Sequence, residues 1–409
     1  SFMGRPVDAT LDQLAQELDR MPGFDARELE RRLLARRGEV PIRDADNRDR
    51  ALFVTVFPRR LGLDVTFFRA LTHPAVPGRG MPSALDVFAA LGDARAREHA
   101  VAAAGASHRR YQAALDALAE KTRAGGSLAG YASTDLYHGW LALLVAVATP
   151  PALPDGERLA FAKSLAWRDR QLYSALAGYT QLKHSAVLYA MQDMGVECDG
   201  DTSYLVAVEE PILPAVRGFV EPNVPLYEGL AALAREAYRR LFGDPEGPTA
   251  DRWADETVPR LNAMNFAREL AEIARAEVAG RPLTDEQARF VELVGGRLEA
   301  LTLGMGRSEY AFSTGGAGRE ERGVALVTDI HSNTDRQQAL ELGIGRIFDL
   351  WVVVPGEVGE TLTQGGVLSF YEFTAPMSER LTDAAWGERV ASGTLPPRPP
   401  WTRSFIEER

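Results

Sequence analysis

The sequence has little cysteine and no long apolar run. Cys198 is the only cysteine among 409 residues, which excludes an internal disulfide and a metal cluster held by several cysteines. A membrane-spanning helix needs about 18 continuous apolar residues. The most apolar stretch, WLALLVAVATPPAL, is interrupted by two prolines. We therefore expect no membrane span.

Basic residues are also in the minority. Lys and Arg total 46 against 57 Asp and Glu, so the formal net charge is −11. A negative charge of this size repels phosphate backbones. The densest basic run, ARELERRLLARR, mixes Arg with Leu and Glu at the spacing of a solvated helix face. We expect no nucleic-acid partner, and instead a small molecule or a peptide.

The start of the chain, SFMGRPVDATLDQ, lacks the basic segment and apolar core of a signal peptide. A lone cysteine also fits a reducing compartment. We expect the chain as it stands to be cytoplasmic; an exported location applies if a leader sequence has been removed from it.

Several catalytic motifs are missing from the sequence. It contains neither the HExxH spacing of many zinc peptidases nor the GxSxG turn that presents a nucleophilic serine. The glycine-rich segment STGGAGREERG precedes a predicted strand, whereas a phosphate-binding loop opens a helix. We expect no nucleotide cofactor.

Apolar residues recur at intervals of three and four through the first two thirds of the chain, which predicts amphipathic helices. Examples are ATLDQLAQELDRM, DARELERRLLARR and SALDVFAALGDARAREHA. The segment STDLYHGWLALLVAVAT is apolar nearly all round, which predicts a buried helix. Glu157–Met194 is predicted to be helical with a break or kink at Gly178, and Thr284 with Gln287 predicts a capping box.

The pattern changes after STGGAGREERG. Runs rich in β-branched and aromatic residues predict strands at Val324–Ile330, Ala339–Ile344, Ile347–Val354 and Gly366–Phe373. Because no helix lies between them, a mainly antiparallel meander is expected. The predicted fold class is α+β and predominantly α-helical. It comprises an N-terminal helical segment (1–50), a helical body (51–318), and a small C-terminal sheet with a closing helix and a Pro-rich tail (319–409), packed on that body.

Several stretches together characterise the whole chain. They are MPSALDVFAALG, DLYHGWLALL, SLAWRDRQLYSALAGYTQLKHSAVLYAMQ, GFVEPNVPLYEGLAALA, VTDIHSN, LWVVVPGEVGETLTQGGVLSFYEF and RLTDAAWGERVASGTLPPRPPWTRSF. In these motifs, which run in this order from about Leu52 to Phe405, the chain resembles the bacterial family called domain of unknown function 3160. Relatives often carry an acid and an arginine where this chain has Gln181 and Lys183. The resemblance implies no reaction, so function has to be inferred from the site.

The segment VTDIHSNTD places polar side chains on every second residue after an apolar run. In a regular strand Asp329, His331, Asn333 and Asp335 share one face. An imidazole with carboxylates suits zinc, iron or manganese better than calcium. The sequence therefore predicts a divalent metal site with Asp329 and His331 as ligands and His184, from the helix QLKHSAVLYAMQ, as a third. The alternatives are a hairpin tip bonded to the backbone and a hydrogen-bonded packing role for His184.

Two glutamates are candidate catalytic groups. Glu221, in GFVEPNVPLYEG, is held in an extended loop by Pro222. It is predicted to act as a metal ligand or a general base, or else to interact with the following helix N-terminus together with Asn223. Glu372, in VLSFYEFTAP, lies between two aromatic residues and is either an exposed partner of a cation or a buried acid with a raised pKa.

These residues lead to two hypotheses. The first is a metal-assisted enzyme, with hydrolysis as the expected reaction, whose site lies where the C-terminal sheet meets the helical body. The second is a non-catalytic module that binds a peptide or another ligand through Tyr137, Trp140 and Tyr371. In the second hypothesis the polar motif only stabilises a turn.

Overall fold

The computed structural model describes residues 62–105, 107–124, 136–156, 158–188, 218–242, 254–304, 325–356 and 359–407. The chain divides into two compact units, Ser1–Leu61 and Gly62–Arg409, and every described residue belongs to the second. The helices predicted before residue 38 and the glycine-rich segment lie outside the described residues.

The first part of the second unit is helical. Its helices are α3 (Leu63–Leu71), α4 (Ala84–Ala90), α5 (Ala94–Ala104), α6 (Tyr111–Ala124), α8 (Leu136–Ala148), α9 (Ala160–Lys163), α10 (Leu165–Leu188), α11 (Val224–Phe242), α12 (Ala254–Val278), α13 (Asp285–Glu292) and α14 (Val294–Gly304). Among the described helices, none has both the length and the apolar character needed to cross a membrane. The apolar α8 has only 13 residues.

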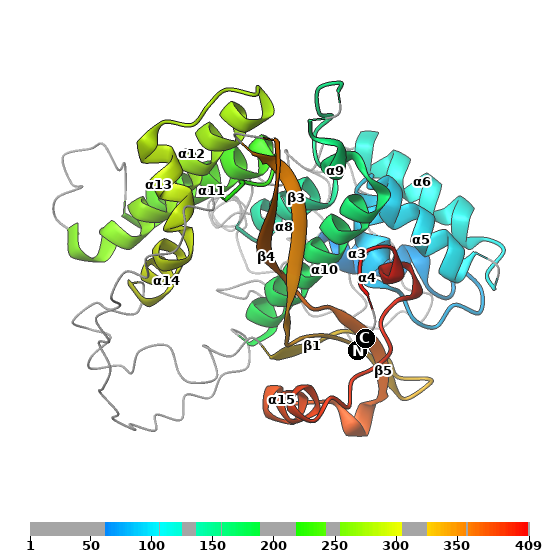
Figure 1. Ribbon diagram of the computed structural model, residues 1–409. Coiled ribbons are helices and arrows are strands. Elements are labelled where there is room, and N and C mark those ends of the chain that lie inside the picture. The colour runs from blue at the N-terminus through cyan, green and yellow to red at the C-terminus, as the bar shows by residue number, and fades with distance from the viewer. Residues whose placement is uncertain are drawn as a thin grey trace, which may run out of the picture. The chain divides into compact units, whose positions relative to one another are not determined.

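Helix α10 is the central element of this unit. It packs against α8, against strands β1 (Leu326–Asn333) and β2 (Gln338–Ile344), and against the C-terminal 3-10 turn η3 (Pro400–Ser404). Figure 1 shows α10 running beside α8. Its middle turns are buried around the helix, with Leu172, Tyr173, Leu176 and Tyr179 all fully inaccessible. Burial on several sides explains why its sequence carries no clear polar stripe.

Two local predictions have different outcomes. The capping box is confirmed: the Thr284 hydroxyl accepts from the Gln287 amide, and the Gln287 side chain accepts from the Thr284 amide. The break at Gly178 is wrong, because α10 continues through it. A Cβ at Gly178 would lie 2.5 Å from the Leu144 side chain, so this glycine allows α8 to approach closely instead of ending the helix.

The strands follow residue 325 and are all antiparallel, which confirms the α+β, mainly helical fold class. They are β1 (Leu326–Asn333), β2 (Gln338–Ile344), β3 (Ile347–Gly356), β4 (Gly359–Leu368) and β5 (Tyr371–Pro376). They form two sheets, β1-β2-β5 and the hairpin β3-β4, rather than one meander. The single strand predicted over Gly366–Phe373 is split at Ser369, whose hydroxyl accepts from the amides of Gly345 (3.0 Å) and Arg346 (2.9 Å) and so fixes a corner.

The three-stranded sheet is covered on both faces. Leu340, Leu342 and Ile344 of β2 enter the main core formed with α3, α4, α6, α8 and α10. The opposite face packs against α15 (Asp383–Ser392), whose fully buried Trp386 contacts Gly343. The C-terminal strands therefore share one core with the helices.

Candidate functional site

A β-bulge interrupts the strand that carries the predicted metal site. In the pairing of β1 with β2, Asp329 lies opposite Glu341 but His331 lies opposite Leu340, so Ile330 is an extra residue. A bulge re-aims the side chains that follow it. Asp329 and His331 consequently face opposite sides of the sheet, and the alternation expected from the sequence ends at Ile330.

Asp329 faces α15. Its carboxylate is ion-paired with Arg380 at 3.0 Å, and Arg380 also donates to the Ser332 hydroxyl at 3.0 Å. Opposite it, Glu341 is fully buried, and its Oε2 lacks a hydrogen-bond partner while Oε1 accepts from the Leu381 amide at 3.3 Å. Burial and the charge of Asp329 raise the pKa of Glu341 to about 7.

His331 faces the helical body. Its ring lies edge-on to Phe68 of α3, with 6.3 Å between centroids. Burial and the charge of Arg79 lower the pKa of His331, which favours the neutral imidazole. On the same face, the Asn333 side chain donates to a backbone carbonyl of the loop before α4 (2.8 Å) and accepts from the Arg336 amide (3.0 Å). Asn333 thus bonds to the backbone, as the turn alternative predicts.

His184 reaches the sheet from α10, but it binds neither of the other predicted ligands. Its Nε2 lies 2.7 Å from Asp383 Oδ2, and Asp383 Oδ1 accepts from the Val327 amide at 2.8 Å. β1 is an edge strand, so Asp383 satisfies an amide that has no ladder partner. Within the described ranges, no group of three or more His, Cys, Asp or Glu side chains is placed to share an ion. The metal site of Asp329, His331 and His184 stays a prediction.

Glu372 faces the helical body at the start of α4. Its Oε2 accepts from the Ala84 amide (2.6 Å) and from the Ser83 hydroxyl (3.2 Å). Burial, together with the charge of Asp86, raises the pKa of Glu372 to about 7. The sequence left open whether Glu372 is an exposed partner of a cation or an acid with a raised pKa, and its surroundings fit the second alternative.

The neighbouring Asp86 is fully buried and fully bonded. It accepts from Tyr111 (2.5 Å) and from the Ser83 amide (2.9 Å), and it is ion-paired with Arg79 at 2.8 Å. The Arg79 guanidinium lies 4.4 Å from the centroid of the Tyr111 ring. No buried side-chain polar atom of this cluster lacks a partner. We assign the cluster of Asp86 and Glu372 to stability.

The three aromatic residues predicted to bind a ligand lie in different surroundings. Tyr371 is 3% exposed and packs edge-on against Trp386. Tyr137 donates to the buried Asp64 at 2.8 Å, and Trp140 is 42% exposed on α8. Lys183, one of the departures from the family pattern, binds the same Asp64 oxygen at 2.9 Å. Tyr371 thus packs against α15, whereas Tyr137 and Trp140 both belong to α8.

Glu221 has the surroundings that best fit a catalytic group. Its two carboxylate oxygens accept from consecutive residues of α10, Arg170 and Gln171, each at 2.9 Å. The Arg170 guanidinium lies 3.9 Å from the Trp167 ring centroid. Arg170 Nε and Gln171 Oε1 are buried without a hydrogen-bond partner. The Glu221 side chain itself is 24% exposed, so it is both fixed and reachable by solvent.

Asn223, and not Glu221, serves the N-terminus of the next helix. Its Oδ1 accepts from the Leu226 amide at 3.3 Å, and its Nδ2 donates to the carbonyl of Ala146 in α8 at 2.7 Å. Asn223 is fully buried. It therefore anchors the loop, while Glu221 turns toward α10.

A second acid, Glu277 of α12, lies against the same loop. It is 5% exposed and accepts from the Val220 amide at 3.0 Å. Burial raises the pKa of Glu277 to about 8, so it keeps its proton at neutral pH. Burial and the charges of Glu221 and Glu277 raise the pKa of the Tyr227 phenol.

A cavity of about 220 Å³ borders this region. Its walls come from Arg158, Ala160 and Phe161, and from Val353, Val354, Pro355, Gly359 and Glu360 at the tip of the β3-β4 hairpin. Arg158 donates to the Glu277 carbonyl at 2.5 Å. Phe161 packs edge-on against Trp167 at 5.0 Å, the ring on which Arg170 lies. The cavity wall thus reaches the backbone of Glu277 through Arg158 and approaches Glu221 only through Trp167 and Arg170, and neither acid lines the cavity.

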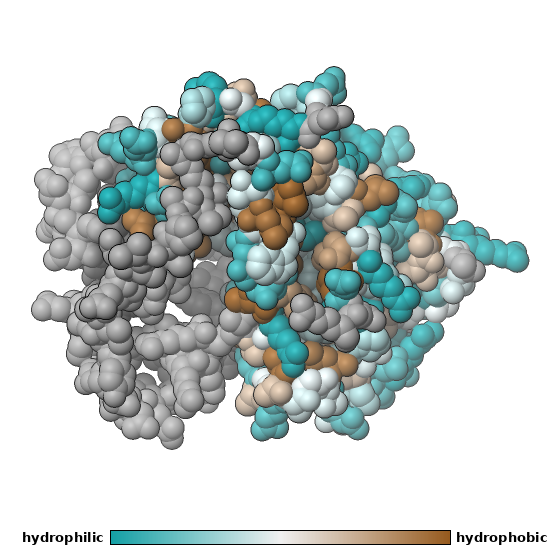
Figure 2. Space-filling view, in the orientation of Figure 1, coloured by the Kyte–Doolittle hydropathy of each residue, from teal (hydrophilic) through white to brown (hydrophobic). Residues whose placement is uncertain are grey.

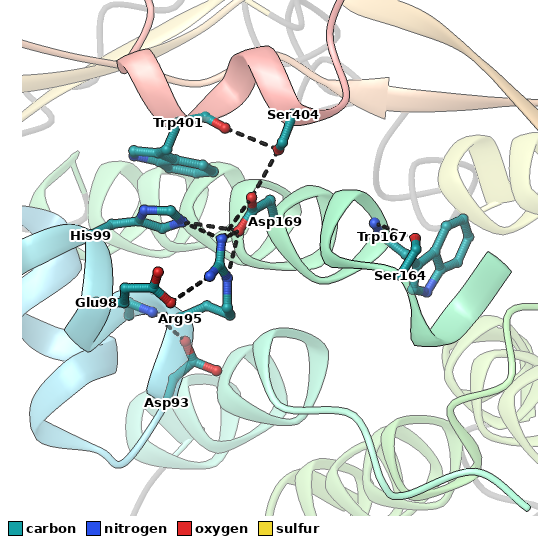
Figure 3. A network of polar contacts seen from close by, with 10 residues as sticks. Asp93, Arg95, Glu98, His99, Ser164, Trp167, Asp169, Trp401 and Ser404 are labelled. Carbon is teal, nitrogen blue, oxygen red and sulfur yellow. Dashed lines mark hydrogen bonds and ion pairs between the residues drawn. The ribbon is translucent and has the colours of Figure 1, made fainter. Parts of the chain in front are cut away.

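Figure 3 shows another polar network, centred on Asp169 of α10. Asp169 accepts from Arg95 (2.7 and 2.9 Å) and from Ser404 (2.8 Å), and its Oδ1 lies 2.9 Å from His99 Nε2. The His99 ring stacks on Trp401 at 4.8 Å. A catalytic serine triad needs histidine between serine and acid, whereas here the acid is central. The network fastens η3 to α5 and α10.

Comparison with known proteins identifies the family. A family model described as Protein of unknown function (DUF3160) matches residues 8–402. The chain belongs to this family. No curated protein and no solved structure matches this DUF3160 chain, so family membership supplies neither a reaction nor a substrate.

Sequence reasoning missed several partners in the DUF3160 chain. Arg170 and Gln171 lie inside SLAWRDRQLYS, which the sequence predicts only as a helix. Helical periodicity alone does not show that both side chains bind Glu221. Glu277 ends a long helix, and nothing in the local sequence shows that Val220 folds onto it. One feature of the sequence could have singled out Glu277: it is an acid near a helix C-terminus, where the helix dipole disfavours a negative charge.

Proposed function

We propose that this protein is a glycoside hydrolase in which Glu277 is the general acid and Glu221 the general base. One observation carries the proposal: two acids meet at one loop in unlike surroundings, Glu277 buried with a raised pKa and Glu221 partly exposed and ion-paired with Arg170. Two carboxyl groups in unlike environments are a pattern of acid–base catalysis, and glycosidases use a pair of carboxylic residues.

The roles follow from the surroundings of each acid. Glu277 keeps its proton up to about pH 8, so it is suited to protonate the leaving oxygen of a glycosidic bond. Glu221, oriented by Arg170 and Gln171, is suited to take a proton from water. That water then adds to the sugar carbon as the bond to the leaving oxygen breaks. Hydrolysis therefore balances without a further reactant.

The nearby cavity combines the aromatic Phe161 with the charged Arg158 and Glu360, and pockets with apolar walls and a few polar groups are typical small-ligand sites. Neither acid lines it, and Arg158 connects it to the backbone of Glu277. The predicted metal site around Asp329 is a separate proposal, and this mechanism does not depend on it.

The test is an activity screen of the full chain with chromogenic aryl glycosides. Aryl esters and casein provide the competing reaction classes. The variants are Glu221→Gln and Glu277→Gln, with Glu228→Gln as the matched control. Glu228 is an exposed glutamate of α11 that is ion-paired with Arg275, so its loss should leave the activity unchanged.

We expect turnover of at least one glycoside, with each of the two site variants losing most of it and Glu228→Gln keeping it. Hydrolysis of esters or casein alone, or glycoside turnover that survives in both site variants, contradicts the proposal.

A further inference from the structure

The cavity between α9 and the β3-β4 hairpin is a second candidate binding site. Neither Glu221 nor Glu277 lines it, so its ligand is separate from the reaction proposed above. Its volume of about 220 Å³ is below the roughly 300–1,000 Å³ of pockets for drug-sized ligands, so it admits only a small molecule. Figure 2 shows hydrophobic (brown) and hydrophilic (teal) residues side by side along this hairpin, and the walls of the cavity are likewise mixed.

Two side chains of opposite charge line the cavity. Arg158 comes from the segment before α9, and Glu360 comes from β4. Among the described residues, Arg158 and Glu360 form no ion pair with each other, so each can form charge-assisted hydrogen bonds to a ligand. A ligand with a single charge gains one of these contacts and is repelled by the other group. The two side chains together therefore favour a zwitterion.

The Arg158 guanidinium is held by the turn that ends α12. Its Nη1 donates to the Glu277 carbonyl and lies against Gly280, where a Cβ would come within 2.8 Å of it. Gly280 has a φ of +71°, a conformation that glycine adopts without strain. A guanidinium has five N–H donors, so the bond to the Glu277 carbonyl leaves donors for a ligand carboxylate.

Apolar side chains form much of the remaining wall. They include Phe161 of α9 and Val353 and Pro355 of β3. The Phe161 ring is packed edge-on by two other rings, Trp167 at 5.0 Å and Phe219 at 5.8 Å between centroids. A wall whose side chains are already ordered loses little conformational entropy when a ligand binds. An apolar group of the ligand can therefore pack against Phe161.

We propose that this cavity binds a free α-amino acid with an apolar side chain. Arg158 binds the carboxylate, Glu360 binds the ammonium group, and Phe161 packs against the side chain. An α-amino acid of this kind combines both charges and an apolar group in a small molecule, whereas a sugar of similar size carries neither charge. The proposal does not rest on the glycosidase function, because neither of the two acids lines the cavity.

The test is isothermal titration calorimetry of the full chain at pH 7 with L-leucine, L-valine and L-phenylalanine. N-acetyl-L-leucine lacks the cationic group, L-leucinamide lacks the anionic group, and D-glucose represents an uncharged sugar. The variants are Arg158→Gln and Glu360→Gln. Arg110→Gln and Glu379→Gln, at exposed positions away from the cavity, are the matched controls. Circular dichroism checks that each variant is folded. Arg158→Gln also loses the bond to the Glu277 carbonyl, so Glu360→Gln provides an independent test.

We expect at least one of the three amino acids to bind with one molecule per chain. Arg158→Gln and Glu360→Gln should each raise its Kd about tenfold or more, because each removes a charge-assisted contact, and both controls should stay within about twofold of wild type. N-acetyl-L-leucine and L-leucinamide should each bind about tenfold more weakly than L-leucine.

Binding of none of the three amino acids overturns the proposal. So does a Kd that Glu360→Gln leaves unchanged, equal binding of N-acetyl-L-leucine, or binding of D-glucose as tight as that of the amino acids. None of these results changes the expected turnover of glycosides, so the binding proposal and the catalytic proposal can fail separately.

Discussion

Two acid pairs in this protein are built from similar groups but differ in their surroundings. The first, Asp86 with Glu372, and the second, Glu221 with Glu277, each combine an ion-paired acid with an acid of raised pKa. Asp86 is fully buried in the main core and all its neighbours are bonded. Glu221 is partly exposed, and each of its partners, Arg170 and Gln171, has a buried polar atom without a hydrogen-bond partner.

The difference shows that a raised pKa does not by itself mark a functional site. Burial raises the pKa of Glu372 as it does that of Glu277, and structural networks perturb titration as active sites do. Access from solvent and unsatisfied polar groups separate the two pairs.

The largest expected effect is on catalysis. Glu221→Gln should lower kcat about 10²–10⁴-fold, because a general base supplies a factor of that order. Glu372→Gln should leave kcat within about threefold, since its carboxyl group is bonded to the start of α4. The measurement is steady-state turnover of the best glycoside found, with melting temperature recorded for each variant. Equal losses in both variants would remove the distinction between the pairs.

The next effect is on stability. Asp86→Asn should lower the free energy of unfolding by about 3–5 kcal/mol, because it leaves the buried Arg79 without its counterion. Asp116→Asn is the matched control: Asp116 also forms a 2.8 Å pair with an arginine, Arg97, but the two side chains are 47% and 41% exposed. Its loss should amount to less than about 1 kcal/mol. Urea denaturation at pH 7 measures both values.

The pH dependence of stability distinguishes Glu372 and Glu277, the two acids whose pKa is raised. In the unfolded chain a glutamate loses its proton near pH 4.5, whereas folded Glu372 keeps it to about 7 and folded Glu277 to about 8. Between those values the unfolded chain binds fewer protons, so stability falls as pH rises, by up to about 1.4 kcal/mol per pH unit for each acid.

Glutamine variants test whether Glu372 and Glu277 cause this pH dependence. Glu372→Gln should reduce the slope between pH 4.5 and 7, and Glu277→Gln should reduce it up to about pH 8. Glu341 also titrates near 7 in the folded chain, so only the interval from 7 to 8 belongs to Glu277 alone. A slope in that interval that Glu277→Gln leaves unchanged contradicts the assignment.

The smallest effect concerns the Asp169 network, which is bonded like the Asp86 cluster but reaches the surface. Ser404→Ala removes one 2.8 Å hydrogen bond to Asp169 and should lower the free energy of unfolding by about 1 kcal/mol. Hydrogen exchange should increase in η3 and stay unchanged in α10. Glycoside turnover that falls together with this bond would assign the network to the active site.

Much of the fold followed from periodicity, while the arrangement of the site did not. The helices α4, α5, α8 and α15, and the antiparallel strands, follow from local patterns of apolar residues. The bulge at Ile330 has no sequence signature in VTDIHSNTD, yet it separates Asp329 from His331. Register in a short edge strand depends on its packing partners on both faces, which local sequence does not specify.

For Glu221 the sequence predicts the local conformation but not the neighbours. Pro222 predicts the extended loop that presents it, but the identity of Arg170, Gln171 and Glu277 as its neighbours depends on helices far apart in sequence. Tyr371 is the opposite case. Strand alternation alone cannot say which sheet face α15 covers, and that face buries Tyr371.

The central claim is that Glu277 donates a proton to the leaving group, and the pH profile of kcat/KM tests it most directly. With an alkyl glycoside, wild-type kcat/KM should fall above about pH 8 as Glu277 loses its proton. With a dinitrophenyl glycoside, whose leaving group needs no proton, Glu277→Gln should keep near wild-type kcat/KM without that fall. A Glu277→Gln variant that loses activity equally on both substrates, or that retains the decline above pH 8, would contradict the account.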